Sequence, residues 1–592
     1  MSLDLEPIFK AMVVLISKQG QPMREYFESE MRLLHEAAAD FSKAHPEQAR
    51  MLNLTEVRDR DPYVERLLEG MAFIAAQIRS RIDDSESAIS EQLLEQLCPG
   101  QLRGYASRTI MHFSPGPNAQ ASKHLPAGSL VRSGQVGEEK QRCYFSTLAE
   151  LQVQPLNIDA VQSRETGKGS TALTLSLSHS GAGNLSELDL SSLDMYLHCD
   201  PALALALCHG LGRPRGKIQF SVEGVDCGQL EKAHVTMPYL DELTYTGHHR
   251  GLPGFSLLQD YFAWRERFFF IRFDGLSKIR FPEKSRECQI QIELPLQLPA
   301  EHQLKAEYFQ LNCVPAINLH EVDADPIDVD QKQGEYRFLP DKSAPDTVVL
   351  HEVLSLTGRD HRSARVIDYQ PFYRAHDYSQ GEYCYRLTRR DLGLATPQPF
   401  LSLSGPGLIP SQTLSARVVV SDGFLPRRYL AENQITQPGE GIPSSLSIRN
   451  LSRPCSYLAC PDSSAYRWQL QAMMQLSAVG LANRESLQSL MGLLDWTGRQ
   501  ENLRRRQSVQ EMNVLPVTRM LRGMLYRGIM VTVHLSQGDF LSLDDIYLFG
   551  CVLHRLLGQL APINESVELK VIAQPSQKEF VWEPQVGCAP PM

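Results

Sequence analysis

Three His-Glu pairs are the residues of this chain whose types most readily suggest metal chemistry. They open the stretches HEAAAD, HEVDAD and HEVLSL, at His35, His320 and His351. A zinc protease of the HExxH class needs a second histidine four residues after the first, so that both rings face one metal from one turn of a helix. Those positions hold alanine, alanine and serine. The pairs therefore predict no zinc protease site.

Two further stretches have only part of a ligand-binding pattern. LGRPRGKIQ resembles a phosphate loop, but Leu211 stands where a glycine is required and Ile218 where a serine or threonine is required. EVDADPIDVD gathers four aspartates, but the fifth and sixth positions of a calcium loop starting at Asp328 are Lys332 and Gln333. We interpret the first stretch as a basic turn entering a strand and the second as a solvated acidic loop.

The remaining candidates are pairs or short runs. The two histidines of TGHHR could bind a metal, and so could Cys551 with His554. Each pair supplies only two ligands, so we interpret these residues as packed or surface side chains. The run Arg504–Arg506 favours a solvated loop or a contact with an acidic protein surface over a nucleic-acid groove. Neither a GxSxG elbow nor a GxGxxG that opens a helix occurs. The sequence therefore predicts no catalytic residue, no cofactor and no metal site.

Composition indicates a large folded protein in a reducing compartment. A chain of 592 residues is several times the length of one typical domain, and a net charge of -10 disfavours a dedicated nucleic-acid binder. The twelve cysteines are scattered and form no CxxC, so we expect reduced thiols. The first twenty residues have neither the basic start of a signal peptide nor ~20 consecutive apolar residues. We expect a cytoplasmic protein without direct membrane insertion.

Hydrophobic spacing predicts helices in residues 1–110. One helix has apolar residues in alternating steps of four and three, as in a seam between helices. It should stop at His45-Pro46, because proline disfavours helical geometry in the residue before it. A second helix is predicted over 61–84, with Asp61 as N-cap and Pro62 at its first position. The first seam consists of Phe27, Met31, Leu34, Ala38 and Phe41.

The second helix has an apolar face that another element must cover. Burying its six larger side chains is worth ~10–18 kcal/mol gross, as an upper bound. Phe73 lies about 180° from Val64 around the helix, so it is either a lone exposed aromatic or a sign that the helix is contacted from two sides. The face is formed by Val64, Leu67, Leu68, Met71, Ala75, Ile78 and Ile82.

The rest of the chain divides into two regions with different sequence patterns. Residues 111–460 contain short alternating runs such as TALTLSLSHS and SARVVVSD, which predict a β-rich middle of about two subdomains. Residues 461–592 predict a C-terminal α/β part, with a helix after Asn483, a strand GIMVTVHLS and a helix capped by Ser542. The predicted fold class is α+β, multidomain, with an N-terminal helical bundle segment.

Stretches in the same order along nearly the whole chain resemble the TssF (VasA, ImpG) family of type VI secretion baseplate subunits. Besides DPYVERLLEGMAFIAAQIRSRIDD they include FQLNCVPAINLHEVDADPIDVD, LFGCVLHRLLGQLAPIN and FVWEPQVG. About twenty residues precede the usual start of the family. The stretch REYFESEMRLLHEAAADFSKAHPE also resembles the family. Members usually have Tyr-Tyr where this chain has Tyr26-Phe27, Glu-Leu at Glu30-Met31 and Phe-Ala at Phe41-Ser42, and His-Pro is present as His45-Pro46.

The resemblance implies a structural wedge subunit without known catalysis. Its implied partners are TssG, TssK, TssE, a second TssF copy, the VgrG hub and the TssB–TssC sheath, in a cytoplasmic baseplate docked at the inner-membrane complex. We predict that alternative packings of the helical bundle switch the baseplate between closed and open states. The alternative hypothesis is a glycan- or peptide-binding hydrolase with its site in the β-rich middle, because spacing alone does not identify paired carboxylates. The predicted partner-binding residues are Val64, Leu67, Leu68, Met71, Phe73 and Ile78.

Overall fold

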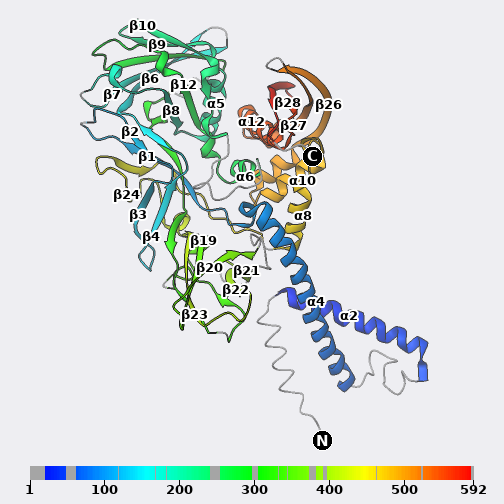
Figure 1. Cartoon of the computed structure of the whole chain (residues 1–592). Coiled ribbons are helices and arrows are strands. Elements are labelled where there is room, and N and C mark those ends of the chain that lie inside the picture. The colour runs from blue at the N-terminus through cyan, green and yellow to red at the C-terminus, as the bar shows by residue number, and fades with distance from the viewer. Residues whose placement is uncertain are drawn as a thin grey trace. The chain divides into compact units, whose positions relative to one another are not determined.

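The computed structural model divides into two compact units, Met1–Leu94 and Glu95–Met592, which are described separately (Figure 1). The α+β class is confirmed, whereas the three-part division of the sequence stays a prediction. The structure describes residues 21–47, 62–117, 119–166, 169–181, 183–240, 254–296, 304–330, 332–342, 344–372, 382–390, 396–461, 463–521 and 524–588.

The first unit contains the two predicted helices, α2 (Gln21–Ala44) and α4 (Pro62–Leu97). Helix α2 ends directly before His45-Pro46, as predicted, whereas Asp61 lies outside the described residues. An ion pair of 2.8 Å between Arg79 Nη1 on α4 and Glu30 Oε1 on α2 joins the two helices.

Helix α4 is longer than the sequence analysis predicted. The predicted end at residue 84 is wrong, because the helix continues without interruption to Leu97 (Figure 1). Residues 85–97 contain no glycine or proline, and helix formers such as Glu, Gln and Leu dominate them. The helix ends directly before Cys98-Pro99, where proline restricts the preceding residue.

The second unit begins with three antiparallel sheets of the β-rich middle. The six-stranded sheet has the order β24 (Ile435–Pro438), β3 (Leu130–Val136), β4 (Gln141–Thr147), β15 (Cys313–Ile317), β1 (Arg108–Ser114), β25 (Ser447–Asn450). The five-stranded sheet has the order β10 (Val225–Glu231), β9 (Arg215–Val222), β13 (Glu287–Leu294), β7 (Ser170–His179), β6 (Leu156–Thr166). The four-stranded sheet has the order β11 (Val235–Thr236), β12 (Phe270–Asp274), β8 (Ser192–Leu197), β14 (Phe309–Leu311).

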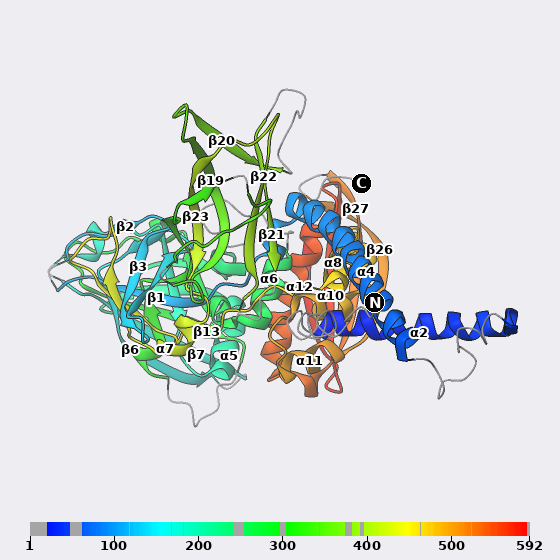
Figure 2. The same cartoon turned by 90° about the horizontal axis from the view of Figure 1, so that it is seen from below.

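An eight-stranded sheet completes the middle region, and Figure 2 shows β19 (Val349–Asp360) and β23 (Gln412–Ser421) as its long strands. Among its described strands only β20 (Val366–Pro371) and β21 (Cys384–Arg390) pair in parallel. A two-stranded sheet joins β2 (Lys123–Leu125) to β5 (Leu151–Val153). The eight-stranded sheet has the order β16 (His320–Asp323), β23 (Gln412–Ser421), β19 (Val349–Asp360), β20 (Val366–Pro371), β21 (Cys384–Arg390), β22 (Gln398–Ser404), β18 (Tyr336–Arg337), with β17 (Ile327–Val329) also on β23.

The C-terminal part is a βαβ arrangement that follows a group of helices. Four helices come first, α8 (Ser464–Met474), α9 (Ala478–Leu481), α10 (Arg484–Leu494) and α11 (Gln500–Gln507). The sheet has the order β26 (Val509–Leu521), β27 (Met524–Ser536), β28 (Glu565–Gln574), β29 (Lys578–Val586), and α12 (Leu543–Leu560) connects the parallel pair β27 and β28.

The predicted helix starts of this part are confirmed. Asn483 accepts a hydrogen bond from the backbone N–H of Glu485, and Ser542 accepts from those of Asp544 and Asp545. Ile546, Phe549, Val552 and Leu556 of α12 are buried, and the Phe549 ring lies 5.5 Å from the Tyr261 ring of α6 (Phe255–Ala263). Gly550 of α12 faces the Trp582 ring of β29, and a Cβ atom on this glycine would collide with that ring. The start of α12 therefore follows from its local sequence, and the structure shows that the helix packs on both α6 and the sheet.

Strand β26 was not predicted, and it pairs with β27 along nearly its whole length. Pro516 interrupts its apolar pattern, and proline is tolerated there because β26 is an edge strand of the sheet. The acidic stretch EVDADPIDVD was also described incompletely. It is solvated at Asp323 and Asp328, as predicted, but it forms strands β16 and β17 on β23 instead of a loop.

Candidate assembly surfaces

Helix α4 presents a row of exposed apolar side chains, which we call the α4 seam. Leu67, Met71, Ile74 and Ile78 are 65%, 53%, 59% and 55% exposed. Their steps of four, three and four residues place them within about 60° around the helix, at about 100° per residue. Such spacing is typical of a surface that packs against another helix.

The opposite side of α4 is buried. Ala72 and Ala76 have no exposed surface, and they lie more than 90° from the α4 seam around the helix. Leu68 and Phe73 are half-buried. Helix α4 therefore already uses its alanine face inside this chain, whereas its larger apolar residues face solvent.

Only some of the predicted partner-binding residues belong to the α4 seam. Leu67, Met71 and Ile78 belong to the α4 seam and Leu68 lies beside it. Phe73 lies about 100° from the nearest seam residue, and the side chain of Val64 is outside the described residues. Ile74 was not among the predicted residues, although it fits steps of four and three along this helix. Whether Phe73 is contacted from a second side stays a prediction.

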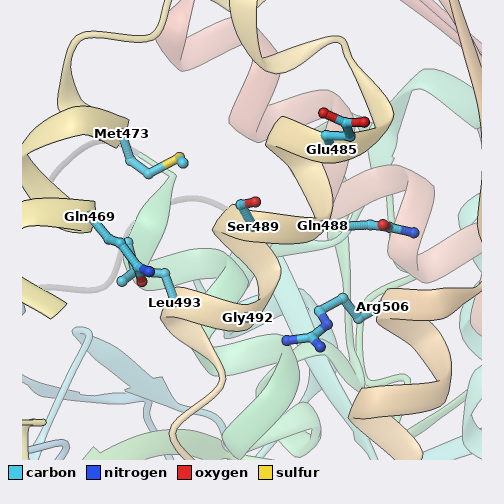
Figure 3. Close-up of a pocket in the computed structure, with 8 residues that line it drawn as sticks. All are labelled: Gln469, Met473, Glu485, Gln488, Ser489, Gly492, Leu493 and Arg506. Carbon is cyan, nitrogen blue, oxygen red and sulfur yellow. The ribbon is translucent and has the colours of Figure 1, made fainter. Parts of the chain in front are cut away.

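A second surface feature is a pocket of about 550 Å³ between helices α8, α10 and α11 (Figure 3). It contains one residue of the run Arg504–Arg506, for which the sequence favoured a solvated loop or a contact with an acidic protein surface. The run is helical, so the loop is wrong, whereas the contact stays a prediction, and the three arginines differ in environment. The pocket is lined by Gln469, Met473, Glu485, Gln488, Ser489, Gly492, Leu493 and Arg506.

The metal-binding candidates do not assemble into a site in the described part of the chain. No group of three or more His, Cys, Asp or Glu side chains could hold a metal ion among those residues. Cys551 accepts a hydrogen bond from Trp582 Nε1 at 3.4 Å, and burial raises the pKa of its thiol. Burial also lowers the pKa of His554 to about 4. The histidines of TGHHR lie outside the described residues.

Two buried aspartates in the second unit hold buried cations. Asp260 of α6 (Phe255–Ala263) forms ion pairs with Arg108 and Arg267 and accepts a hydrogen bond of 2.7 Å from the Tyr105 hydroxyl. All four side chains are nearly inaccessible to solvent. Because Arg108 lies on β1, this network attaches α6 to the six-stranded sheet.

The next residue of α6 bonds to the second aspartate. Tyr261 donates a hydrogen bond of 3.0 Å to Asp545 of α12, which also accepts one of 2.9 Å from Arg505 Nη2. Asp545 and Arg505 are buried. These carboxylates have fixed structural partners, so they join α6 to the C-terminal helices.

Buried histidines predict acid sensitivity. Burial lowers the pKa of each of His112, His320 and His554 to about 4. An unfolded histidine titrates near 6.5, so the unfolded chain binds these protons first as the pH falls. The stabilisation is complete above pH 6.5 and is lost as the pH falls towards 4, with up to about 3 kcal/mol per histidine.

His320→Gln should therefore lower the midpoint pH of acid unfolding, measured by near-UV circular dichroism between pH 7 and 4. Asp422 has the opposite effect on stability at acidic pH. Burial raises its pKa to about 6, so the folded chain binds that proton before the unfolded chain does. Three histidines outweigh one aspartate. His124→Gln is the control, since His124 is 62% exposed, and equal midpoints for both variants would contradict the prediction.

Comparison with known proteins identifies the family of this chain. The family described as "Type VI secretion system, TssF" matches residues 20–589. The type VI secretion system component TssF1 of Pseudomonas aeruginosa is 25% identical over 632 residues, which cover 96% of this chain and 99% of that protein. Among the described residues, no helix is long and apolar enough to cross a membrane.

Two solved structures have the same fold. A chain of a TssK-TssF-TssG baseplate subcomplex, solved by cryo-electron microscopy, is 25% identical with a TM-score of 0.73, covering 89% of this chain and 100% of that one. A chain of a type VI secretion baseplate complex is 24% identical with a TM-score of 0.62, covering 96% and 100%. The family match spans nearly the whole chain and agrees with the resemblance of the ordered motifs. This chain belongs to the TssF family of the type VI secretion system.

Proposed function

We propose that this chain is a structural subunit of a type VI secretion baseplate. The match of residues 20–589 to the TssF family carries this proposal, because it includes both the helical first unit and the β-rich second unit. The relative in the cryo-electron microscopy structure assembles with TssK and TssG. We infer TssG and TssK as the partners of this chain as well.

The α4 seam supports assembly through helices. Burying a large aliphatic side chain is worth about 1.5–3 kcal/mol, and the four residues of the seam are each more than half exposed in the single chain. A partner helix with its own four-three spacing would cover them in the manner of a coiled coil. We propose that Leu67, Met71 and Ile78, with Ile74, form the centre of this contact, and that Val64, Leu68 and Phe73 lie at its margins.

Further contacts follow from the same proposal. TssE, a second copy of this chain, VgrG and the TssB–TssC sheath are its proposed neighbours in the complete baseplate, which would dock at the inner-membrane complex. Alternative packings of the helical bundle would switch the baseplate between closed and open states. A covalent crosslink across the bundle should block secretion, and a crosslinked bundle that secretes normally would contradict the switching.

The test of the proposed function is co-purification. Co-expression with the TssG and TssK chains of the same gene cluster should give one complex of constant stoichiometry in size-exclusion chromatography with multi-angle light scattering. The chain expressed alone should associate or aggregate through its exposed apolar side chains. Elution of this chain as a separate monomer, after co-expression with both partners, would contradict the proposal. The alternative hypothesis of a hydrolase has no support from the relatives.

A further inference from the structure

The pocket between α8, α10 and α11 has two chemically different ends. In Figure 3, Arg506 extends from α11 towards Gly492, while Met473 and Gln469 approach α10 from α8. The volume of about 550 Å³ lies within the ~300–1,000 Å³ of typical ligand sites. A binding partner would therefore meet a cation at one end and the sulfur-containing side chain of Met473 at the other.

Arg506 differs from the residue before it. Arg505 is buried and paired with Asp545, so its charge is neutralised inside the second unit. Arg506 is half-buried, and in the part of the chain that the structure describes no carboxylate lies within ion-pairing distance of its guanidinium. Consecutive arginines of one helix thus have separate roles, one internal and one directed into the pocket.

The backbone of α10 leaves space for this guanidinium. A Cβ atom on Gly492 would lie 2.5 Å from Arg506 Nη1, closer than atoms can approach. Glycine costs roughly 0.5–1 kcal/mol relative to alanine inside a helix, and Gly492 lies inside α10. The glycine therefore allows the guanidinium to lie against the helix, where it faces the pocket.

The lining around Arg506 is suited to a peptide. Leu493 is buried and Met473 half-buried, which provides an apolar floor, and Gln469 and Ser489 are exposed polar residues at the edge. Glu485, at the end away from Arg506 in Figure 3, would repel a second carboxylate. This arrangement favours a segment with one acidic side chain near an apolar one over a polyanion such as nucleic acid.

The helices around the pocket carry more arginines than acidic residues, which suits an acidic partner. Residues 463–507 contain six arginines and three acidic residues, and five arginines remain when Arg505, which Asp545 neutralises, is left out, whereas the whole chain carries a net charge of -10. A local surplus of cations on an acidic protein attracts acidic partners at the range of the Debye length, about 8–10 Å. Charge complementarity therefore points to an acidic occupant.

We propose that this pocket binds a short acidic segment of another baseplate subunit. A carboxylate of the segment pairs with the Arg506 guanidinium, and an adjacent apolar side chain packs on Met473 and Leu493. Charge-assisted pairs of arginine with carboxylate are among the stronger hydrogen bonds, particularly when partly shielded from water. This inference rests on the proposed function, because that function supplies the partner subunits.

The test is site-specific photocrosslinking in the assembled complex. The photoreactive amino acid p-benzoyl-phenylalanine replaces Ser489 in the full chain, which is co-expressed with its TssG and TssK partners and irradiated. Mass spectrometry should identify a crosslinked partner peptide in which Asp or Glu lies beside an aliphatic or aromatic residue. Combining this with Arg506→Glu should lower the crosslink yield at least tenfold, since the carboxylate would then meet a like charge.

Matched variants separate the pocket from general charge effects. Arg504→Glu makes the same charge change on the same helix at an exposed residue that does not line the pocket, and the yield should stay within twofold of the parent. Arg506→Lys should retain a large part of the yield, because it keeps the charge but not the fork of donors. Gly492→Ala should lower the yield by displacing the guanidinium, and equal melting temperatures will show that each variant is folded.

Three results would overturn the inference. They are a crosslinked peptide without acidic residues, equal crosslink yields for Arg506→Glu and Arg504→Glu, and no crosslink in a complex that assembles normally. Failure of the proposed function gives a different result, since co-purification of the wild-type chain with TssG and TssK would then be absent before any crosslink is measured.

Discussion

Met71→Asp should abolish assembly with the partner subunits and leave the chain itself folded. The side chain of Met71 is 53% exposed, so an aspartate there remains hydrated in the single chain. In the proposed interface the same carboxylate would be buried without a partner, which costs several kcal/mol. We expect a loss of affinity of at least 100-fold, measured by biolayer interferometry or by co-purification from a co-expression strain.

Three further variants make this result specific to the α4 seam. Met71→Leu keeps an apolar side chain of similar size and should assemble normally. Leu408→Asp replaces the 93% exposed leucine of the β22–β23 loop, so it should leave assembly intact although it makes the same kind of change. Ala72→Asp buries a charge on the covered side of α4 and should destabilise the first unit. Normal assembly of folded Met71→Asp would contradict the role of the seam.

Asp260→Ala should be among the most destabilising single substitutions in the second unit. It removes the carboxylate shared by Arg108 and Arg267, whose charges then stay buried without it. Breaking a buried ion pair by deleting one partner costs about 3–5 kcal/mol, and here two cations are affected. The midpoint of unfolding in urea, followed by tryptophan fluorescence, should fall accordingly or the protein should become insoluble.

The control for this prediction is an ion pair at the surface. Glu28→Ala removes the partner of Arg24 on α2, and both side chains of that pair are more than half exposed. Exposed pairs contribute about 0–1 kcal/mol, so the midpoint should hardly change. Asp260→Asn, which retains hydrogen-bonding capacity but no charge, should give an intermediate result. Equal unfolding midpoints for Asp260→Ala and wild type would show that the network does not hold α6 in place.

Local features of the fold could be predicted from the sequence because neighbouring residues determine them. Asn483 and Ser542 cap helices through bonds to backbone groups two or three residues away. The end of α2 before His45-Pro46 depends on one peptide unit, and the alternation of β7 and β23 is a property of single strands. The order of family motifs is likewise contained in the linear chain, so it was sufficient to predict the family.

The direction in which each face points was decided by the tertiary structure. Periodicity predicts that α4 has an apolar face, but it does not say that Ala72 and Ala76 are covered while Met71 and Ile74 face solvent. That outcome depends on which elements the rest of the chain brings to the helix. The length of α4 was underestimated for a related reason, since the apolar stripe weakens after residue 84 while the backbone remains helical.

The sequence by itself determined the α+β class, the helix caps and the family, all of which depend on residue type and on spacing over a few positions. Only the tertiary structure decided that Arg505 pairs with Asp545 while Arg506 faces a pocket, and that Asp260 meets Arg108 across 152 positions of sequence. The physical reason is that partners of buried charges and the lining of a pocket come from segments far apart in the chain. Folding brings those segments together, and no local pattern records which of them will meet.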